Sequence, residues 1–179
     1  EIRDGETAEI AMRAAMTGHL VISTIHTEDA VSAIARLIDM GVEPFLIASG
    51  LRGVISQRLL RRICNNCREE YTPDETILSI SGVNVYPGRK FMHGTGCDAC
   101  FHSGYRGRVG VFELLMINEK LRRAITSSED VTTLREIAAE SEFITMQQHA
   151  DRIVDEGITT VEEIVRTISM DDYDIAFDG

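Results

Sequence analysis

The four cysteines of the chain form two C-x-x-C pairs, Cys64/Cys67 and Cys97/Cys100. Two residues between the thiolates let one tight turn point both sulfurs at a single metal ion, and two such turns complete a tetrahedral site. A site closed by four sulfurs has no open coordination position, so the pattern is typical of structural zinc. We therefore predict that Zn²⁺ binds these cysteines and that the fold brings the two turns together.

Two disulfides or four free thiols are the alternatives to a metal site. Free thiols would rarely fall into two such pairs and nowhere else in the chain. Disulfides form in oxidising compartments, but the opening residues EIRDGETAEIAMR are charged and helix-like, unlike a signal peptide. No apolar run approaches the roughly 20 residues that cross a bilayer. The cysteine pattern therefore favours a reducing compartment.

The first forty residues alternate between helical and strand-like patterns. Small apolar residues recur at helical spacing in 6–17, and residues 30–40 are again helical, with Thr27 as the expected N-cap. Between them, residues 19–25 (HLVISTI) are apolar and β-branched, as in a strand covered on both faces. This alternation predicts an α/β fold with a partial parallel sheet.

Beyond the first forty residues, strand-like segments are followed by a helical region. Residues 53–63 are ambiguous between strand and helix, with a strand favoured for their first half, and 109–117 have a strand pattern. The residues that follow predict a C-terminal helical bundle, with Thr160 capping its last helix and a frayed acidic tail at 171–179.

The segment between these strands has little hydrophobic periodicity and contains all four cysteines. Such a segment buries little apolar surface and needs a cross-link. We therefore expect three parts: a first domain at 1–63, a tetracysteine zinc subdomain at 64–107, and a C-terminal strand and helical subdomain at 108–179.

The charge of the chain argues against nucleic acid as a partner. The formal net charge is −11, whereas phosphate contacts need clustered Lys and Arg. The one basic cluster, QRLLRRIC at 57–64, is local, and its composition fits a solvated face as well as a functional patch. A zinc-ribbon module that binds nucleic acid is therefore disfavoured.

Several long motifs resemble one family, the secretion ATPases of type II secretion and type IV pilus assembly. The resemblance covers residues 1–168 and is carried by EIRDGETAEIAMRAAMTGHLVISTIHTEDA, RLIDMGVEPF, QRLLRRICNNC, GCDAC and GYRGRVGVFELL. It implies the C-terminal portion of a RecA-like P-loop ATPase core. It further implies a homo-hexameric ring with ATP and Mg²⁺ between subunits, on the cytoplasmic side of the inner membrane. The implied partners are the inner-membrane platform and other cytoplasmic-membrane components of the secretion or pilus machinery.

The resemblance also assigns roles to residues near the start of the chain. Glu1 matches the Walker B acid, which polarises the attacking water and supports Mg²⁺, and Arg3 belongs to the same motif. His19 and His26 match the two histidines of the family's histidine box. The residues alone favour a structural role for each histidine. With the resemblance, His26 is the stronger catalytic candidate, because it follows the predicted strand at its carboxyl edge, where ligands bind in open sheets. We therefore predict Glu1, Arg3, His19 and His26 as catalytic residues, and Glu1, Thr24 and His26 as nucleotide ligands.

The sequence departs from the family in one respect. It contains no G-x-x-x-x-G-K-[ST] phosphate loop, which in the family precedes the Walker B motif. We therefore predict that this stretch starts inside a domain and does not bind or hydrolyse ATP appreciably by itself. The alternative function is a zinc-stapled protein-interaction module without catalysis.

Overall fold

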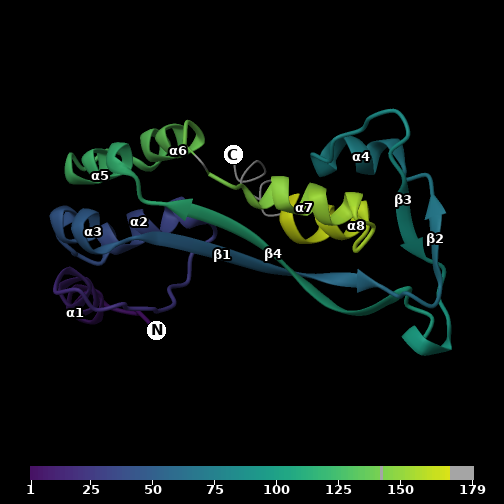
Figure 1. Ribbon diagram of the computed structural model, residues 1–179, viewed down its shortest axis with the longest axis horizontal. Helices are drawn as coiled ribbons and strands as arrows, with labels where there is room; N and C mark the ends of the chain where they lie inside the picture. The colour runs from purple at the N-terminus through teal and green to yellow at the C-terminus, as the bar shows by residue number, and fades with distance from the viewer. Residues whose placement is uncertain (142, 170–179) are drawn as a thin grey trace, which may run out of the picture. The chain divides into compact units, whose positions relative to one another are not determined.

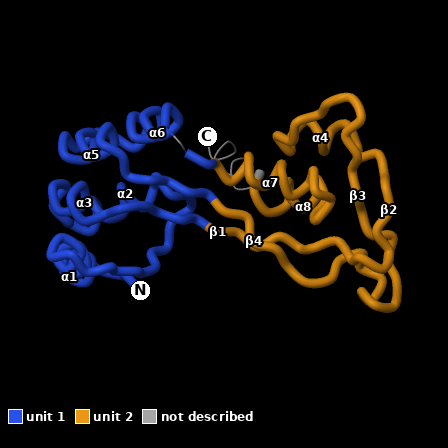
Figure 2. Tube along the Cα trace, viewed as in Figure 1, with its two compact units in different colours: residues 1–56, 113–144 blue, residues 57–112, 145–179 orange. Residues whose placement is uncertain are grey.

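The computed structural model describes residues 1–141 and 143–169. The chain divides into two units, coloured separately in Figure 2. Unit 1 comprises Glu1–Ser56 and Glu113–Ile144, and unit 2 comprises Gln57–Phe112 and the residues from Thr145 onward. Each unit therefore joins two stretches that are distant in sequence. The predicted boundaries of the three parts stay a prediction, and the tail at 171–179 lies outside the described residues.

The chain passes between the units within two long strands, β1 (Gly53–Ile63) and β4 (Tyr105–Met116), which pair with each other (Figure 1). The strand predicted for the first half of 53–63 is confirmed, and β1 continues through the second half, which the sequence left ambiguous. The predicted strand at 109–117 falls almost entirely within β4. β1 contains three β-branched residues, and β4 contains two together with two aromatic residues; these types suit a pleated backbone.

Unit 1 is mainly helical. Its helices are α1 (Gly5–Met16), α2 (Ala30–Asp39), α3 (Pro44–Gly50), α5 (Glu119–Thr126) and α6 (Val131–Ala139). They enclose a core of fully buried aliphatic side chains, whose largest members are Ile34, Ile47, Leu115, Leu121, Ile125 and Leu134. Ala30 and Val31, the first residues of α2, belong to this core, and α2 follows His26 closely in the chain.

Short polar side chains cap the starts of α1, α2, α5 and α6 in unit 1. Asp4 accepts a hydrogen bond from the amide of Thr7 at 2.8 Å, and Asp29 accepts one from the amide of Ser32 at 2.6 Å. The predicted cap at Thr27 is therefore wrong. The extended backbone of Asp29 lets its carboxylate reach the third amide of α2, whereas the Thr27 hydroxyl donates to the carbonyl of Asp29.

The predicted strand at 19–25 does not form. These residues lie outside any helix or strand, and Leu20 and Ile22 are 87% and 85% exposed. The sheets among the described residues are the pairs β1–β4 and β2–β3, so the partial parallel sheet expected from the alternation is also absent there. The physical reason is that, in the described part of the chain, the backbone of 19–25 forms isolated hydrogen bonds, from the amide of Ile2 to Thr24 and from the amide of His19 to Ala14, rather than the repeated bonds of a strand ladder.

Unit 2 combines a small hairpin with helices. Strands β2 (Arg68–Tyr71) and β3 (Phe91–Gly94) pair antiparallel. The helices are α4 (Glu75–Ser81), α7 (Met146–Asp155), α8 (Val161–Ile164), the short η1 (Asp98–Cys100) and the π-helical turn η2 (Val165–Ser169). Thr160 caps α8 as predicted. The predicted C-terminal bundle is not confirmed, because α5 and α6 belong to unit 1 while α7 and α8 belong to unit 2.

Glu163 is a buried carboxylate at the centre of unit 2. Its side chain is inaccessible to solvent and accepts hydrogen bonds from the amide and guanidinium of Arg61 and from the guanidinium of Arg166. Burial opposes ionisation, but the bonds from Arg166 and Arg61 prevail and lower the pKa of Glu163 to about 2. Glu163 therefore ties α8 to β1 as an ionised group.

Replacing this carboxylate should destabilise the fold in a pH-dependent way. We expect Glu163→Gln to lower the free energy of unfolding by roughly 2 kcal/mol at pH 7, because both arginines lose a charged acceptor. A carboxyl group whose pKa is depressed in the folded state stabilises it above the unfolded pKa of about 4.3. The difference from the unsubstituted chain should therefore shrink as pH falls from about 5 towards 2.

Urea unfolding at a series of pH values measures this difference. The control is Glu156→Gln, an exposed side chain on the C-cap of α7, which should change stability by less than about 0.5 kcal/mol. A pH-independent loss of stability in Glu163→Gln would show that the charge of Glu163 is not what stabilises the unit.

Candidate functional site

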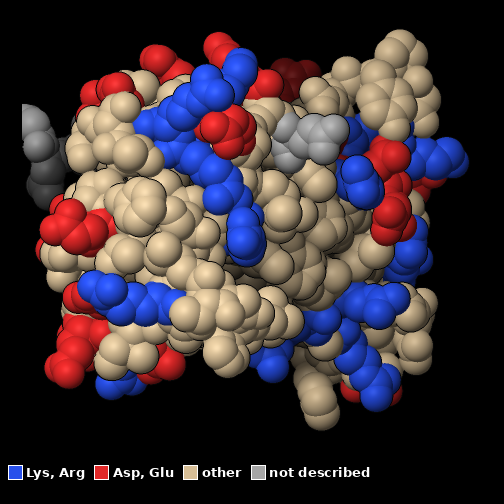
Figure 3. Space-filling model, turned by 60° about the vertical axis from the view of Figure 1, so that its left-hand side comes forward, with Lys and Arg blue, Asp and Glu red and all other residues tan. Residues whose placement is uncertain are grey.

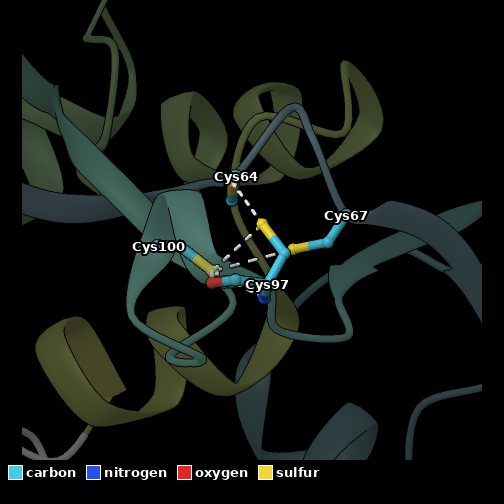
Figure 4. A group of neighbouring side chains, drawn as sticks. All are labelled: Cys64, Cys67, Cys97 and Cys100. Carbon is cyan, nitrogen blue, oxygen red and sulfur yellow. Dashed lines mark hydrogen bonds between the residues drawn. The ribbon is translucent and has the colours of Figure 1, made fainter.

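The four cysteines meet at one point of unit 2, as Figure 4 shows. All four sulfurs lie within 4.8 Å of one another. The Sγ atoms of Cys64 and Cys97 are 3.9 Å apart, and Cys100 Sγ is 3.8 Å from those of Cys67 and Cys97. A tetrahedral ion with metal–sulfur bonds of about 2.3 Å needs sulfurs about 3.8 Å apart, whereas a disulfide needs about 2.05 Å. The arrangement therefore fits a four-coordinate metal ion and does not fit two disulfides.

The backbone shapes this cluster through two tight turns and one close approach. The amide of Cys67 donates to the carbonyl of Cys64, and the amide of Cys100 donates to that of Cys97. A side chain on Gly94 would collide with the carbonyl of Gly104, and a side chain on Gly104 with that of Gly94. The end of β3 can therefore lie against the residues before β4 only because both positions are glycine.

Backbone amides donate hydrogen bonds to two of the sulfurs, although burial still raises the pKa of the Cys67 thiol to about 12. Gly96 donates to Cys67 Sγ at 3.3 Å, and Cys97 donates to Cys100 Sγ at 3.2 Å. Burial acts to raise the pKa of the Cys100 thiol, but amide donors from Cys97 and Gly104 outweigh it and lower that pKa to about 6. A thiol with this pKa is ionised at neutral pH, which is the form that binds metal.

A second cluster lies in unit 1, where Glu1 meets the loop that follows α1. His26 Nε2 is 2.8 Å from a carboxylate oxygen of Glu1, and Arg3 donates to the other oxygen at 2.6 Å. The amide of Ile2 donates to the carbonyl of Thr24 at 2.7 Å and holds the two segments together. The hydrogen bond from Arg3 is the largest cause of the lowered pKa of Glu1, so the carboxylate stays ionised well below neutral pH.

The candidate residues of unit 1 do not all gather at this cluster. Glu1, Arg3 and His26 are in contact, and Thr24 contributes its carbonyl through the bond to Ile2. His19 contacts the end of α1 instead: its Nδ1 is 3.0 Å from the hydroxyl of Thr17 and 3.3 Å from the carbonyl of Ala14. The side chain of His26 is 91% exposed, so the cluster is open to a ligand.

Sequence reasoning missed the groups that fix the segment directly after His26. Glu113 on β4 is buried and accepts a hydrogen bond at 2.7 Å from the amide of Ala30, the first residue of α2. Arg135 on α6 donates to Asp29 at 2.5 Å and to Ser32 at 3.1 Å. An acid within the otherwise apolar run VGVFELLMI was the available signal for Glu113.

Comparison with known proteins points to one family. A family profile described as "Type II/IV secretion system protein" matches residues 1–166. The chain is 46% identical over 171 residues to the type IV pilus assembly ATPase PilB of Thermus thermophilus, covering 94% of this chain and 19% of that protein. It is 43% identical over 166 residues to the type II secretion system protein E of Dickeya dadantii, covering 93% of this chain and 33% of that protein.

A solved structure supports the same grouping. The chain is similar to the pilus retraction motor PilT with bound ADP, with a TM-score of 0.59 and 27% identity. The match covers 93% of this chain and 37% of that one. The chain therefore spans between about a fifth and a third of the length of the curated relatives above.

The cysteine cluster should hold one metal ion per chain. We expect Cys64→Ser/Cys97→Ser to lose that ion and to lower the unfolding midpoint of the chain, because each segment of the cluster would lose a ligand. Metal analysis by mass spectrometry and thermal unfolding measure the two effects. The control is His102→Asn, because His102 pairs with exposed Asp98 and asparagine tolerates its positive φ of 59°. Metal-free chain of undiminished stability would contradict the prediction.

Proposed function

Because the chain belongs to the type II/IV secretion system protein family, we propose that it is the C-terminal part of a motor ATPase that drives pseudopilus or pilus assembly. The observation that carries the proposal is the contact of Glu1 with His26 at 2.8 Å, beside Arg3. These side chains come from the segments that match the Walker B motif and the histidine box. Their meeting places an ionised acid next to an exposed imidazole, which suits phosphoryl transfer to water.

The residues have separate roles in this proposal. The Glu1 carboxylate orients the attacking water and helps to hold Mg²⁺, which neutralises charge on the phosphates when it is bound. Arg3 keeps that carboxylate ionised, and the His26 ring donates a hydrogen bond to a γ-phosphate oxygen. Thr24 is a further nucleotide ligand, and its carbonyl already fixes the distance between the two segments. His19 acts separately, from the end of α1.

The remaining parts of the proposal concern assembly. We place the intact protein in a homo-hexamer with ATP between subunits, in the cytoplasm and peripherally on the inner membrane. Its partners are the inner-membrane platform and other cytoplasmic-membrane components of the machinery. Across 1–141 and 143–169, no helix is long and apolar enough to span a bilayer. Zn²⁺ is the metal that we assign to the four cysteines, because a closed four-sulfur set is typical of structural zinc.

The alternative is a zinc-stapled protein-interaction module without catalysis. The cysteine cluster and the lack of a G-x-x-x-x-G-K-[ST] motif in this sequence favour it for the 179 residues taken alone. The two functions differ in whether the Glu1 cluster has a catalytic effect once a phosphate loop is present.

Glu1→Gln tests the catalytic role in a longer protein that contains this stretch and a phosphate loop. We expect its kcat for ATP hydrolysis to fall at least about 100-fold, because the amide cannot accept the proton of the attacking water. His26→Ala should lower kcat by about tenfold or more, through loss of a donor to the phosphate. The control is Glu9→Gln, a partly exposed acid of α1 that pairs with Arg13. A phosphate-release assay that finds Glu1→Gln fully active would rule out the proposed mechanism.

The 179-residue chain by itself should bind ATP only weakly. The amides of a phosphate loop supply most of the contacts to the β- and γ-phosphates, and this sequence has no such motif. Isothermal titration calorimetry with Mg²⁺ and ATP measures the affinity. A dissociation constant in the micromolar range would overturn the expectation of weak binding. It would not bear on the role of Glu1 in the longer protein.

A further inference from the structure

A pocket of about 290 Å³ lies at the end of β1 in unit 2. It is formed by the end of β1, the turn with the first cysteine pair, and the start of β4. Its lining residues are Arg62, Ile63, Cys64, Asn65, Asn66 and Arg106. Both arginines and both asparagines are exposed, whereas the isoleucine and cysteine are buried. The pocket therefore presents guanidinium and amide groups to solvent.

The two arginines of the pocket lack partners among the residues that the structure describes. Within the described ranges, the guanidinium groups of Arg62 and Arg106 form no hydrogen bond or ion pair. The neighbouring Arg61, by contrast, bonds to Glu163. The chain has 29 acidic residues against 18 Lys and Arg, and Figure 3 shows the two kinds interspersed over one face. Two arginines beside one pocket without a carboxylate are therefore unexpected in this chain.

We propose that this pocket binds a carboxylate side chain from an acidic segment of a partner protein. The planar fork of a guanidinium matches a carboxylate with two parallel hydrogen bonds. Asparagine amides can donate to the same oxygens or to a peptide carbonyl beside them. Small-molecule pockets usually measure about 300–1,000 Å³, so this pocket suits one acidic side chain better than a nucleotide. The proposal does not depend on the ATPase function.

The cysteine cluster offers a competing explanation for the arginines. Four thiolates around Zn²⁺ carry a net negative charge, which nearby cations stabilise. The hydrogen bonds to the sulfurs of Cys67 and Cys100, however, come from backbone amides, and neither Arg62 nor Arg106 bonds to a sulfur in the described structure. If the arginines serve the cysteine cluster, their removal should release the metal. If they bind a ligand, their removal should weaken ligand binding and leave the metal in place.

An anionic membrane is a less suitable ligand for this pocket than the carboxylate of an acidic protein segment. An extended lipid surface attracts clusters of several Lys and Arg and interacts with the whole chain, whose net charge is −11. A single carboxylate is influenced mainly by charges within the Debye length of about 8 Å at physiological salt. The local pair of arginines therefore favours an acidic protein segment.

The experiment is an NMR titration of the metal-loaded 179-residue chain with a short capped Glu-Gly peptide. Side-chain N–H signals of arginine and asparagine report on the pocket. We expect Arg62→Gln/Arg106→Gln to weaken binding at least about tenfold, because two charged donors are lost. Arg62→Lys/Arg106→Lys keeps the charge but removes the fork, and should weaken binding about threefold with the metal retained.

The matched control is Arg36→Gln/Arg52→Gln. It removes the same charge from two exposed arginines of unit 1 and should change the dissociation constant less than about twofold. Equal affinity of this control and the pocket variant would overturn the proposal, as would equal binding of a Gln-Gly peptide.

Three further outcomes would also overturn it. Loss of metal from Arg62→Gln/Arg106→Gln would assign the arginines to the cysteine cluster. Binding of inorganic phosphate without binding of the Glu-Gly peptide would make the site one for free phosphate. Binding only to vesicles of phosphatidylglycerol and phosphatidylcholine would make it a membrane contact.

Discussion

The part of unit 2 that contains the hairpin depends on the meeting of four sulfurs. Cys64 directly follows β1, Cys67 precedes β2, and the second pair lies between β3 and β4. The two hairpin strands have four residues each, few of them buried, and a two-stranded hairpin of this kind is marginal in water. The cluster therefore supplies a constraint that hydrophobic burial does not, and it holds four strand ends at one point. The proposed acid-binding pocket uses the same turn, so its shape depends on the cluster.

Buried carboxylates provide the long-range polar connections within each unit. In unit 1, Glu113 accepts from the amide of Ala30, and in unit 2, Glu163 accepts from the amide of Arg61. Each acid satisfies a backbone donor that no helix or strand partner reaches, and an unsatisfied buried donor would cost about 1–3 kcal/mol. Through Ala30, Glu113 fixes the residues that follow His26, which links the core of unit 1 to the candidate catalytic cluster.

The candidate catalytic cluster shows which parts of the site can be predicted from sequence motifs. Motif matching predicted Glu1 and Arg3 from one segment and His26 from another, and the structure brings these three into contact. Their proposed roles are not tested by this contact. The strand expected just before His26 was wrong, because apolar and β-branched composition indicates a strand only where another backbone can pair with it.

The sequence by itself determined the features that depend on close neighbours in the chain. The C-x-x-C turns, the cap at Thr160 and the strand character in the first half of 53–63 follow from residues a few positions apart. Only the tertiary structure decided that the two cysteine pairs meet in a tetrahedral arrangement and that Glu113 reaches Ala30. It also divided the helices after β4 between two units. The physical reason is that local propensity acts over one turn, whereas these contacts depend on the path of the whole backbone, which a single sequence pattern does not contain.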